Sequence, residues 1–194
     1  MVVAVGAGAA ILVEGWSDQA AVERLAQRRG WNLQAEGVVV LPIGGATNIG
    51  KFLRALGPQG LNVRLAGLYD VGEERHIQRS LEQVGLGKQL TRADKEALGF
   101  FVCNADLEDE LIRALGATTV ERALDAQDEL GSFRRFQKQP NQRGRDNHAQ
   151  LRRFMGTRAG RKIRYGSLLV DALDLDQAPR ALGLVLAHVL ASSK

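Results

Sequence analysis

The sequence predicts an α/β fold built on a parallel sheet of about four strands with helices on its faces. Short apolar runs typical of buried strands occur at residues 10–13, 37–41, 64–69 and 99–105. Segments of helical character separate these runs, and strands that alternate with helices form parallel sheets. Three of the four runs are followed at once by a carboxylate residue. The sequence therefore predicts acidic side chains at the carboxyl ends of three strands, which is where open α/β sheets bind ligands.

The composition is that of one domain, or of one domain with an appendage. The chain has 194 residues, of which 45% are hydrophobic, and this is enough for a sizeable core. No apolar run is long enough to span a membrane, and the first ten residues lack the positive charges of a signal peptide. The single cysteine, Cys103, excludes an intramolecular disulfide and a cysteine zinc site, and we expect it to be a buried thiol. We expect a cytoplasmic protein without membrane contact.

The first strand leads directly into a candidate metal site. Glu14 and Gly15 follow residues 10–13, and Ser17 or Asp18 is suited to cap a helix that runs to about residue 29. Asp18 lies on the first turn of that helix, so its carboxylate can face the same point as Glu14. Two acids at one strand end suit a hard divalent cation. The alternative is that both acids only cap the helix, whose N-terminus favours negative charge.

The second strand ends in a glycine turn. Gly45, Gly50 and Lys51 match the phosphate-loop spacing G-x-x-x-x-G-K, but Phe52 stands where a Ser or Thr would hold magnesium. We therefore expect a turn followed by an amphipathic helix to about residue 56, and no nucleotide site.

The third and fourth strands also end on acids. Asp70 closes the third strand, and a helix is expected from residue 73 to about 84, with a polar connector at 85–98. Asp106 and Glu108 follow the fourth strand and can both reach its carboxyl end.

Further along the chain, Asp109 and Glu110 are expected to face solvent. The remaining helices are expected at residues 111–115, 120–130, 165–173 and 178–191.

Right-handed crossovers bring the carboxyl ends of parallel strands to one edge of the sheet, so the strand-end acids should converge. A cluster of carboxylates repels itself unless cations neutralise it. We interpret the set as a magnesium-type site used in phosphodiester chemistry. Its members are Glu14, Asp18, Asp70, Asp106 and Glu108.

Positive charge is concentrated late in the chain. Residues 131–165 contain eleven Lys and Arg and one acid, a charge of +10, so the remainder carries −6 of the overall +4. An acidic body with a basic segment suits a nucleic acid that is held together with a divalent metal. The alternative is a solvated face. The residues expected to bind nucleic acid are Arg143, Arg145, Arg152, Arg153, Arg158, Arg161 and Arg164.

Several of these motifs resemble the toprim domain shared by topoisomerases, primases and some nucleases. The resemblance is strongest to the toprim domain of the OLD-family (overcoming lysogenization defect) endonucleases, and it extends over about residues 10–190. The sequences that carry it are Val-Glu-Gly at 13–15 with Asp18, Leu-Pro-Ile-Gly-Gly at 41–45, Leu-Tyr-Asp at 68–70, Asp-Leu-Glu-Asp-Glu-Leu at 106–111 and Gly-Arg-Lys at 160–162.

The resemblance implies a Rossmann-like toprim fold and two-metal cleavage of phosphodiester bonds with Mg²⁺ or Mn²⁺. Glu14 and Asp18 would bind one metal, Asp70 would bind from the third strand, and Asp106 and Glu108 would complete the cluster. Glu14 and Lys162 would be catalytic, since Lys162 can stabilise negative charge on the phosphate or on the leaving oxygen. Lys162 could instead be one solvated charge among eleven.

The chain departs from the family pattern in two respects. The family has Asp-x-Asp after the third strand, and Gly72 replaces the second Asp here. Glu73 is then a candidate substitute ligand. The ATPase portion usual in the family is not in the sequence, so we expect a free-standing toprim protein or one that works with a separate ATPase subunit.

We expect a toprim core at residues 10–130, a basic segment that contacts nucleic acid at 131–165, and C-terminal helices that pack on the core at 166–194. The leading hypothesis is a metal-dependent endonuclease whose substrate is DNA, with RNA as the less favoured alternative. The alternatives are a non-catalytic nucleic-acid-binding or adaptor protein with a degenerate metal site, and a primase-like nucleotidyl transferase. The oligomeric state is open.

Overall fold

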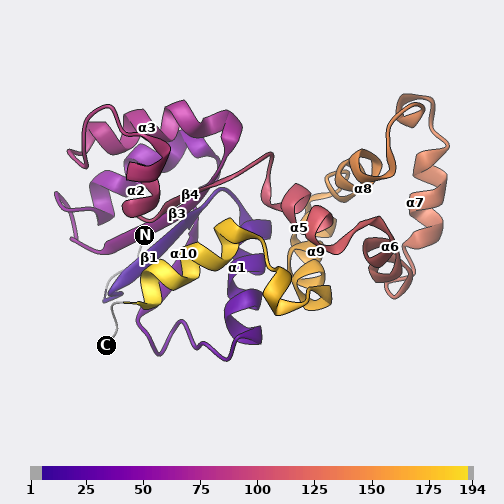
Figure 1. Cartoon of the computed structure of the whole chain (residues 1–194), viewed down its shortest axis with the longest axis horizontal. Helices are drawn as coiled ribbons and strands as arrows, with labels where there is room; N and C mark the ends of the chain where they lie inside the picture. Colours follow the sequence, from indigo (N-terminus) through magenta and orange to yellow (C-terminus); the bar gives the residue numbers. More distant parts are fainter. Residues whose placement is uncertain (1–5, 192–194) are drawn as a thin grey trace.

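The computed structural model describes residues 6–191 and contains the predicted four-stranded parallel sheet (Figure 1). The strands are β1 (Ala9–Val13), β2 (Val38–Pro42), β3 (Arg64–Asp70) and β4 (Phe100–Cys103). Their order in the sheet is β2-β1-β3-β4, and every neighbouring pair is parallel. The predicted α/β fold class is confirmed.

The strand order reverses direction between β1 and β3. The chain first adds β2 on one side of β1 and then returns to place β3 on its other side. Ile11 of β1 lies between Val40 of β2 and Ala66 of β3, while Asp70 at the end of β3 is opposite Cys103 of β4. Such a switch point creates a crevice at the carboxyl ends of the strands. The residues that follow β1, β3 and β4 therefore meet there.

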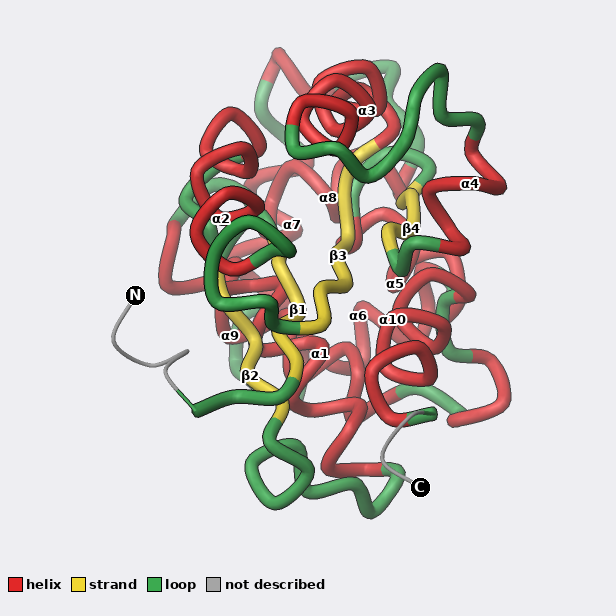
Figure 2. Tube along the Cα trace, turned by 90° about the vertical axis from the view of Figure 1, so that its left-hand side faces the viewer, coloured by secondary structure: helices red, strands yellow, loops and turns green. Residues whose placement is uncertain are grey.

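Two helical layers cover the sheet. On one face lie α1 (Trp16–Arg28) and α10 (Arg180–Leu190), and on the other lie α2 (Ile49–Leu56), α3 (Glu74–Gln83) and α4 (Arg92–Ala97). Figure 2 shows the strands between these layers. Alternate residues of β1 serve the two faces: Ile11 and Val13 pack toward α1, and Ala10 and Leu12 pack toward α2. Burial on both faces explains why the strands read as continuous apolar runs.

A helical extension projects from the edge of the sheet at β4 (Figure 1). It follows β4 in the order α5 (Leu107–Leu115), α6 (Ala117–Asp125), α7 (Leu130–Gln137), α8 (Asn147–Met155) and α9 (Ala159–Ala172). Phe133 and Phe136 of α7 pack on Phe154 of α8, with ring centroids 5.3 and 5.5 Å apart. None of the helices within residues 6–191 is long and apolar enough to cross a membrane.

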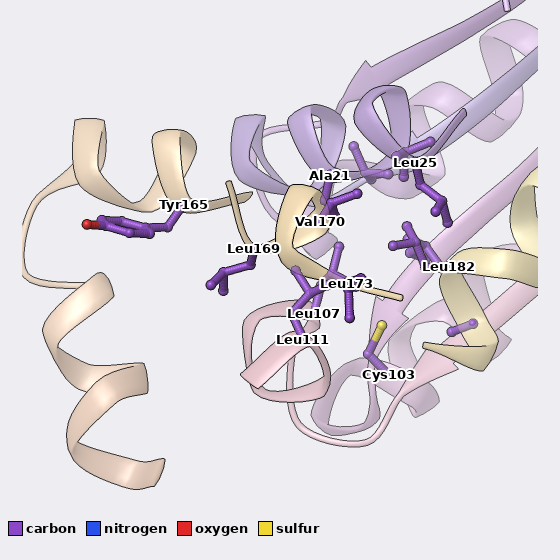
Figure 3. Packing of buried hydrophobic residues seen from close by; sticks show 14 of the residues in the cluster. Ala21, Leu25, Cys103, Leu107, Leu111, Tyr165, Leu169, Val170, Leu173 and Leu182 are labelled. Atoms are coloured by element: carbon purple, nitrogen blue, oxygen red, sulfur yellow. The ribbon is translucent and has the colours of Figure 1, made fainter. Parts of the chain in front are cut away.

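The last two helices return the chain to the sheet. Helix α9 packs along α1, and α10 packs on β3 and β4. In Figure 3, Leu169 and Val170 of α9 and Leu173 just after it lie between residues of α1 and α5. Cys103 is buried in the same cluster, as predicted for its thiol. One apolar core therefore runs from the sheet into the extension and fixes their relative position.

The structure corrects two sequence expectations about helices. The expected connector at 85–98 contains α4, whose first turn is capped by reciprocal hydrogen bonds between Thr91 and Asp94. The expected helix at 120–130 is divided between α6 and α7. The basic stretch 131–165 is mostly helical, because a few widely spaced apolar residues such as Phe133 and Leu151 are fully buried by tertiary packing.

Candidate metal centre

A pocket of about 150 Å³ lies at the carboxyl ends of β1, β3 and β4. It brings together all five acids predicted at the strand ends, together with the predicted cation from α9. The lining residues are Glu14, Gly15, Asp18, Gly45, Asp70, Asp106, Glu108 and Lys162.

The first strand and the glycine turn after β2 together position Glu14. The N–H groups of Gly44 and Gly45 donate hydrogen bonds to the Glu14 carbonyl oxygen at 3.1 and 3.2 Å. Both glycines have positive φ values, of 71° and 106°, which favour glycine over other residues. The turn therefore holds the backbone of Glu14, a role that the sequence pattern alone did not indicate.

The start of α1 differs from the sequence expectation. The N-cap is Gly15, in an extended conformation, and Ser17 is buried inside the helix. Asp18 occupies the third helical position, and its Oδ2 accepts a hydrogen bond from the Gly15 N–H at 2.9 Å. Asp18 thereby fastens the chain between Glu14 and α1 and still faces the pocket.

Both carboxylate oxygens of Asp106 have partners. Asp106 is the N-cap of α5, and its Oδ1 accepts the Asp109 N–H at 2.7 Å. Its Oδ2 accepts from Arg152 of α8, with Nε at 2.8 Å and a terminal guanidinium nitrogen at 2.6 Å. The Arg152 guanidinium thus neutralises the Asp106 carboxylate of the pocket.

Glu108 is a buried acid without hydrogen-bond donors. The residue is 4% exposed, and neither carboxylate oxygen accepts a hydrogen bond from the described residues. Lys162 Nζ lies 3.3 Å from its Oε1, an ion pair outside hydrogen-bond geometry. Although burial opposes its charged form, the carboxylates of Glu108 and Asp18 raise the pKa of Lys162. A buried carboxylate with this little compensation favours a cation at the pocket.

The acids also perturb one another. Burial, reinforced by the charge of Glu108, raises the pKa of Asp18 to about 7. Burial and the nearby charges of Glu14 and Asp106 raise the pKa of Asp70 to about 7. Below about pH 7, Asp18 and Asp70 in the metal-free pocket therefore hold protons that a divalent cation would displace.

The chemistry of the pocket fits a hard divalent cation, because carboxylate oxygens are the ligands that such ions prefer. The oxygens are not yet gathered around one point: among residues 6–191, no three His, Cys, Asp or Glu side chains form a group that could hold an ion. The Asp18 carboxylate accepts a hydrogen bond from the Gly15 N–H, and the Asp106 carboxylate accepts one from Arg152. Metal binding would therefore require some of these side chains to move.

The raised pKa values predict how stability depends on pH. In the unfolded chain Asp18 and Asp70 lose their protons near pH 4, whereas in the folded chain they keep them to about pH 7. The folded state binds more protons between these values, so the free energy of unfolding decreases as pH rises through this range. Without divalent ions, we expect the melting temperature to decrease as the pH is raised from about 5 to 8. We expect Mn²⁺ to raise the melting temperature by more at pH 8 than at pH 5.

This is measurable by thermal unfolding with and without EDTA. Asp70→Asn should reduce the pH dependence, because the amide does not titrate. A melting temperature equally insensitive to pH in both proteins would contradict the electrostatic description of the pocket.

Two residues that follow the third strand, Gly72 and Glu73, do not line the acidic pocket. Gly72 lines a separate cleft with residues of α3 and α4, and Glu73 is not among the residues lining the acidic pocket. The expectation that Glu73 substitutes for the missing Asp is thus not supported by its position.

Asp109 was expected in solvent but is 7% exposed. It pairs with Arg113 and with His148 Nε2, the latter at 2.6 Å. The sequence could not reveal this contact, since His148 lies on α8.

A second cleft, of about 480 Å³, adjoins the acidic pocket and shares three of its residues, Asp106, Glu108 and Lys162. We call it the basic cleft. Besides the shared residues it is lined by Arg145, Ala149, Arg152, Arg153 and Gly156.

The other predicted nucleic-acid contacts are placed differently. The prediction that Arg161 contacts nucleic acid does not agree with its burial, since the residue is 8% exposed. Its guanidinium lies 4.0 Å from the Phe154 ring centroid, and its Nε donates a hydrogen bond to Glu129 at 3.0 Å. Arg164 also pairs with Glu129 but is half-exposed. Arg143 and Arg158 are exposed and lie outside the basic cleft.

Comparisons with known proteins agree with this architecture. Residues 7–71 match the family described as "Overcoming lysogenization defect protein-like, TOPRIM domain". None of the curated proteins matches the chain. Among solved structures, the C-terminal region of the Burkholderia pseudomallei OLD protein has a TM-score of 0.74 and 20% identity, over 97% of this chain and 99% of that chain.

The C-terminal region of the Xanthomonas campestris pv. campestris OLD protein has a TM-score of 0.72 and 25% identity, over 96% of this chain and 94% of that chain. The likeness thus extends beyond the sheet to the helices after β4. Residues 7–71 thus match an OLD-like TOPRIM domain, and the fold of the whole chain is similar to that of the C-terminal regions of these two OLD proteins.

Proposed function

We propose that this chain is a metal-dependent nuclease domain that hydrolyses phosphodiester bonds, with DNA favoured over RNA. The observation that carries the proposal is the acidic pocket at the topological switch point, which opens beside the basic cleft. Divalent ions, Mg²⁺ or Mn²⁺, would supply an activated water and stabilise the leaving oxygen. The residues that would hold them are Glu14, Asp18, Asp70, Asp106 and Glu108.

Lys162 is proposed to stabilise the negative charge that develops on the phosphate. It projects from α9 into both cavities and already faces Glu108. Its carboxylate neighbours raise its pKa, so the amine stays protonated at neutral pH. A fixed cation at this position lowers the energy of a charged transition state.

The basic cleft is proposed as the nucleic-acid contact. Arg145 and Arg153 are exposed, line the cleft, and have no carboxylate partner within the described residues. Neutralising a phosphate releases counterions, so each contact contributes about 0.9 to the slope of log affinity against log salt.

We expect the double variant Arg145→Gln, Arg153→Gln to bind duplex DNA more weakly and to reduce this slope by about 2. Fluorescence polarisation of a labelled duplex in EDTA, at several salt concentrations, measures both the affinity and the slope. Arg79→Gln combined with Arg122→Gln removes the same charge from exposed positions on α3 and α6 and should leave the slope nearly unchanged. Equal slopes for the two double variants would show that the cleft does not bind DNA.

Gly72 is expected to make the centre prefer Mn²⁺ over Mg²⁺. The position lacks a carboxylate, and Mg²⁺ demands near-ideal octahedral coordination. The backbone of Gly72 is outside the left-handed region, and an added Cβ would meet no atom within 4 Å, so Asp fits here without strain. We expect Gly72→Asp to raise the Mg²⁺-supported nicking of supercoiled plasmid.

Gly72→Asn, which has the same shape without the charge, is the control. If Gly72→Asp changes nicking in neither metal, this loop does not contribute to the metal centre.

A second candidate is a non-catalytic nucleic-acid-binding module, which the missing acid at position 72 favours. Supercoiled plasmid incubated with the protein and Mg²⁺, Mn²⁺ or EDTA separates the two. Nicking with either metal but not with EDTA supports the nuclease. DNA binding without nicking in either metal supports the binding module.

A further inference from the structure

The ion pair between Arg152 and Asp106 joins the acidic pocket to the basic cleft. Arg152 lines the cleft, and Asp106 lines both cavities. Two guanidinium nitrogens contact one carboxylate oxygen, Oδ2, at 2.6 and 2.8 Å. The other oxygen, Oδ1, is used to cap α5. Both lone pairs of Oδ2 are therefore occupied, and this oxygen can reach a metal ion only if Arg152 withdraws.

The contact is built so that Arg152 can withdraw. Its side chain is 43% exposed, and pairs at such positions contribute little to stability. No described residue other than Asp106 forms an ion pair with Arg152. A guanidinium binds a phosphate with the same two-pronged geometry that it uses for a carboxylate. Arg152 can therefore exchange one anion for the other within the cleft.

We infer that Arg152 couples metal binding to nucleic-acid binding. It neutralises Asp106 when no ion is present, and it contacts a substrate phosphate when a divalent ion takes Asp106. This inference rests on the proposed function, and it makes Arg152 a positioning residue rather than a fixed phosphate contact. Because coupling is reciprocal, the ion strengthens nucleic-acid binding by the same factor as the nucleic acid strengthens ion binding.

Calorimetric titration of Mn²⁺ tests the first half of this inference without any cleavage reaction. Arg152→Gln removes the competitor for Asp106, so we expect Mn²⁺ to bind about two- to fivefold more tightly, the range that a partly exposed ion pair supports. Arg153→Gln is the matched control, since it removes the same charge from the neighbouring residue of the same cleft. Its effect should be smaller than that of Arg152→Gln.

A second titration tests the coupling between Mn²⁺ binding and nucleic-acid binding. A cleavage-resistant phosphorothioate duplex, at a concentration that saturates each variant, should tighten Mn²⁺ binding to the wild-type protein and to Arg153→Gln, but not to Arg152→Gln. Circular dichroism melting checks that each variant is folded. If Arg152→Gln is unfolded, Arg152→Lys replaces it and should show a smaller shift in the same direction, because one ammonium replaces two guanidinium contacts.

The possible failures are distinguishable. Equal Mn²⁺ affinities for the two Gln variants, or weaker binding by Arg152→Gln, would overturn the coupling role and leave the metal centre intact. Coupling that persists in Arg152→Gln would also overturn it. The absence of Mn²⁺ binding in the wild type and in both variants would overturn this inference together with the proposed metal site.

Discussion

Replacing Glu14 by Gln is expected to reduce metal-dependent nicking of supercoiled plasmid by at least about 100-fold, since even outer residues of metal sites cost 10- to 100-fold when changed. Glu14 follows β1 directly, and its charge helps to raise the pKa of Asp70 across the pocket. Gln keeps the size and shape of the side chain but removes the negative charge. The lost rate would therefore report on ion binding and not on packing.

Folding should survive the Glu14→Gln change. The Glu14 side chain is exposed, and the backbone contacts from Gly44 and Gly45 involve its carbonyl oxygen, which is unaltered. Removing one acid from a repelling cluster should raise the melting temperature of the metal-free protein slightly. Glu36→Gln, the same chemical change in an exposed loop before β2 at the opposite end of the sheet, is the control and should nick like the wild type. Unaltered nicking by Glu14→Gln would remove Glu14 from the catalytic centre.

Replacing Gly166 by Ala is expected to lower the free energy of unfolding by about 1–3 kcal/mol, the usual cost of an inserted methyl group in a packed interface. Gly166 lies where α9 passes closest to the start of α1, and a Cβ there would be 2.4 Å from the Ser17 carbonyl oxygen. The helices must separate to admit it. Ser17 precedes Asp18, and Lys162 lies one turn before Gly166, so the separation would also move both of these pocket residues. We expect weaker nicking in addition to the loss of stability.

Gly160→Ala in the same helix is the control. An added Cβ at Gly160 would meet no atom within 4 Å. Ala is a better helix former than Gly, so this variant should be unchanged or more stable by about 0.5 kcal/mol. Urea unfolding of both variants measures the difference. Equal stability of the two would show that the contact between α9 and α1 tolerates extra volume.

The strands and the acids at their ends are predictable from sequence because their signals are local. A strand buried on both faces must be apolar at every position, and this produces the runs before Glu14, Asp70 and Asp106. Parallel strands joined by helices must place their carboxyl ends at one edge. The chemistry of the pocket follows from these two constraints without knowledge of any distant contact.

The long-range contacts required the tertiary structure. Arg152 and Lys162 lie 46 and 54 residues after their partners Asp106 and Glu108, and no sequence period links them. The same holds for Asp109, which the sequence assigns to solvent and which His148 contacts from 39 residues away. Arg161 reads as one cation of a basic segment, yet packing between α8 and α9 buries it on Phe154.

Local features are predictable from the sequence and long-range contacts are not, for a physical reason. Periodicity and capping depend on neighbours a few residues apart, whereas pairing of charges depends on how helices pack. The helices after β4 are brought back to the sheet by buried side chains such as Phe133, Tyr165 and Leu169. Their packing determines which cations face the acids and which are buried. The sequence therefore indicates that a cluster of acids exists, and only the folded chain determines which cations neutralise it.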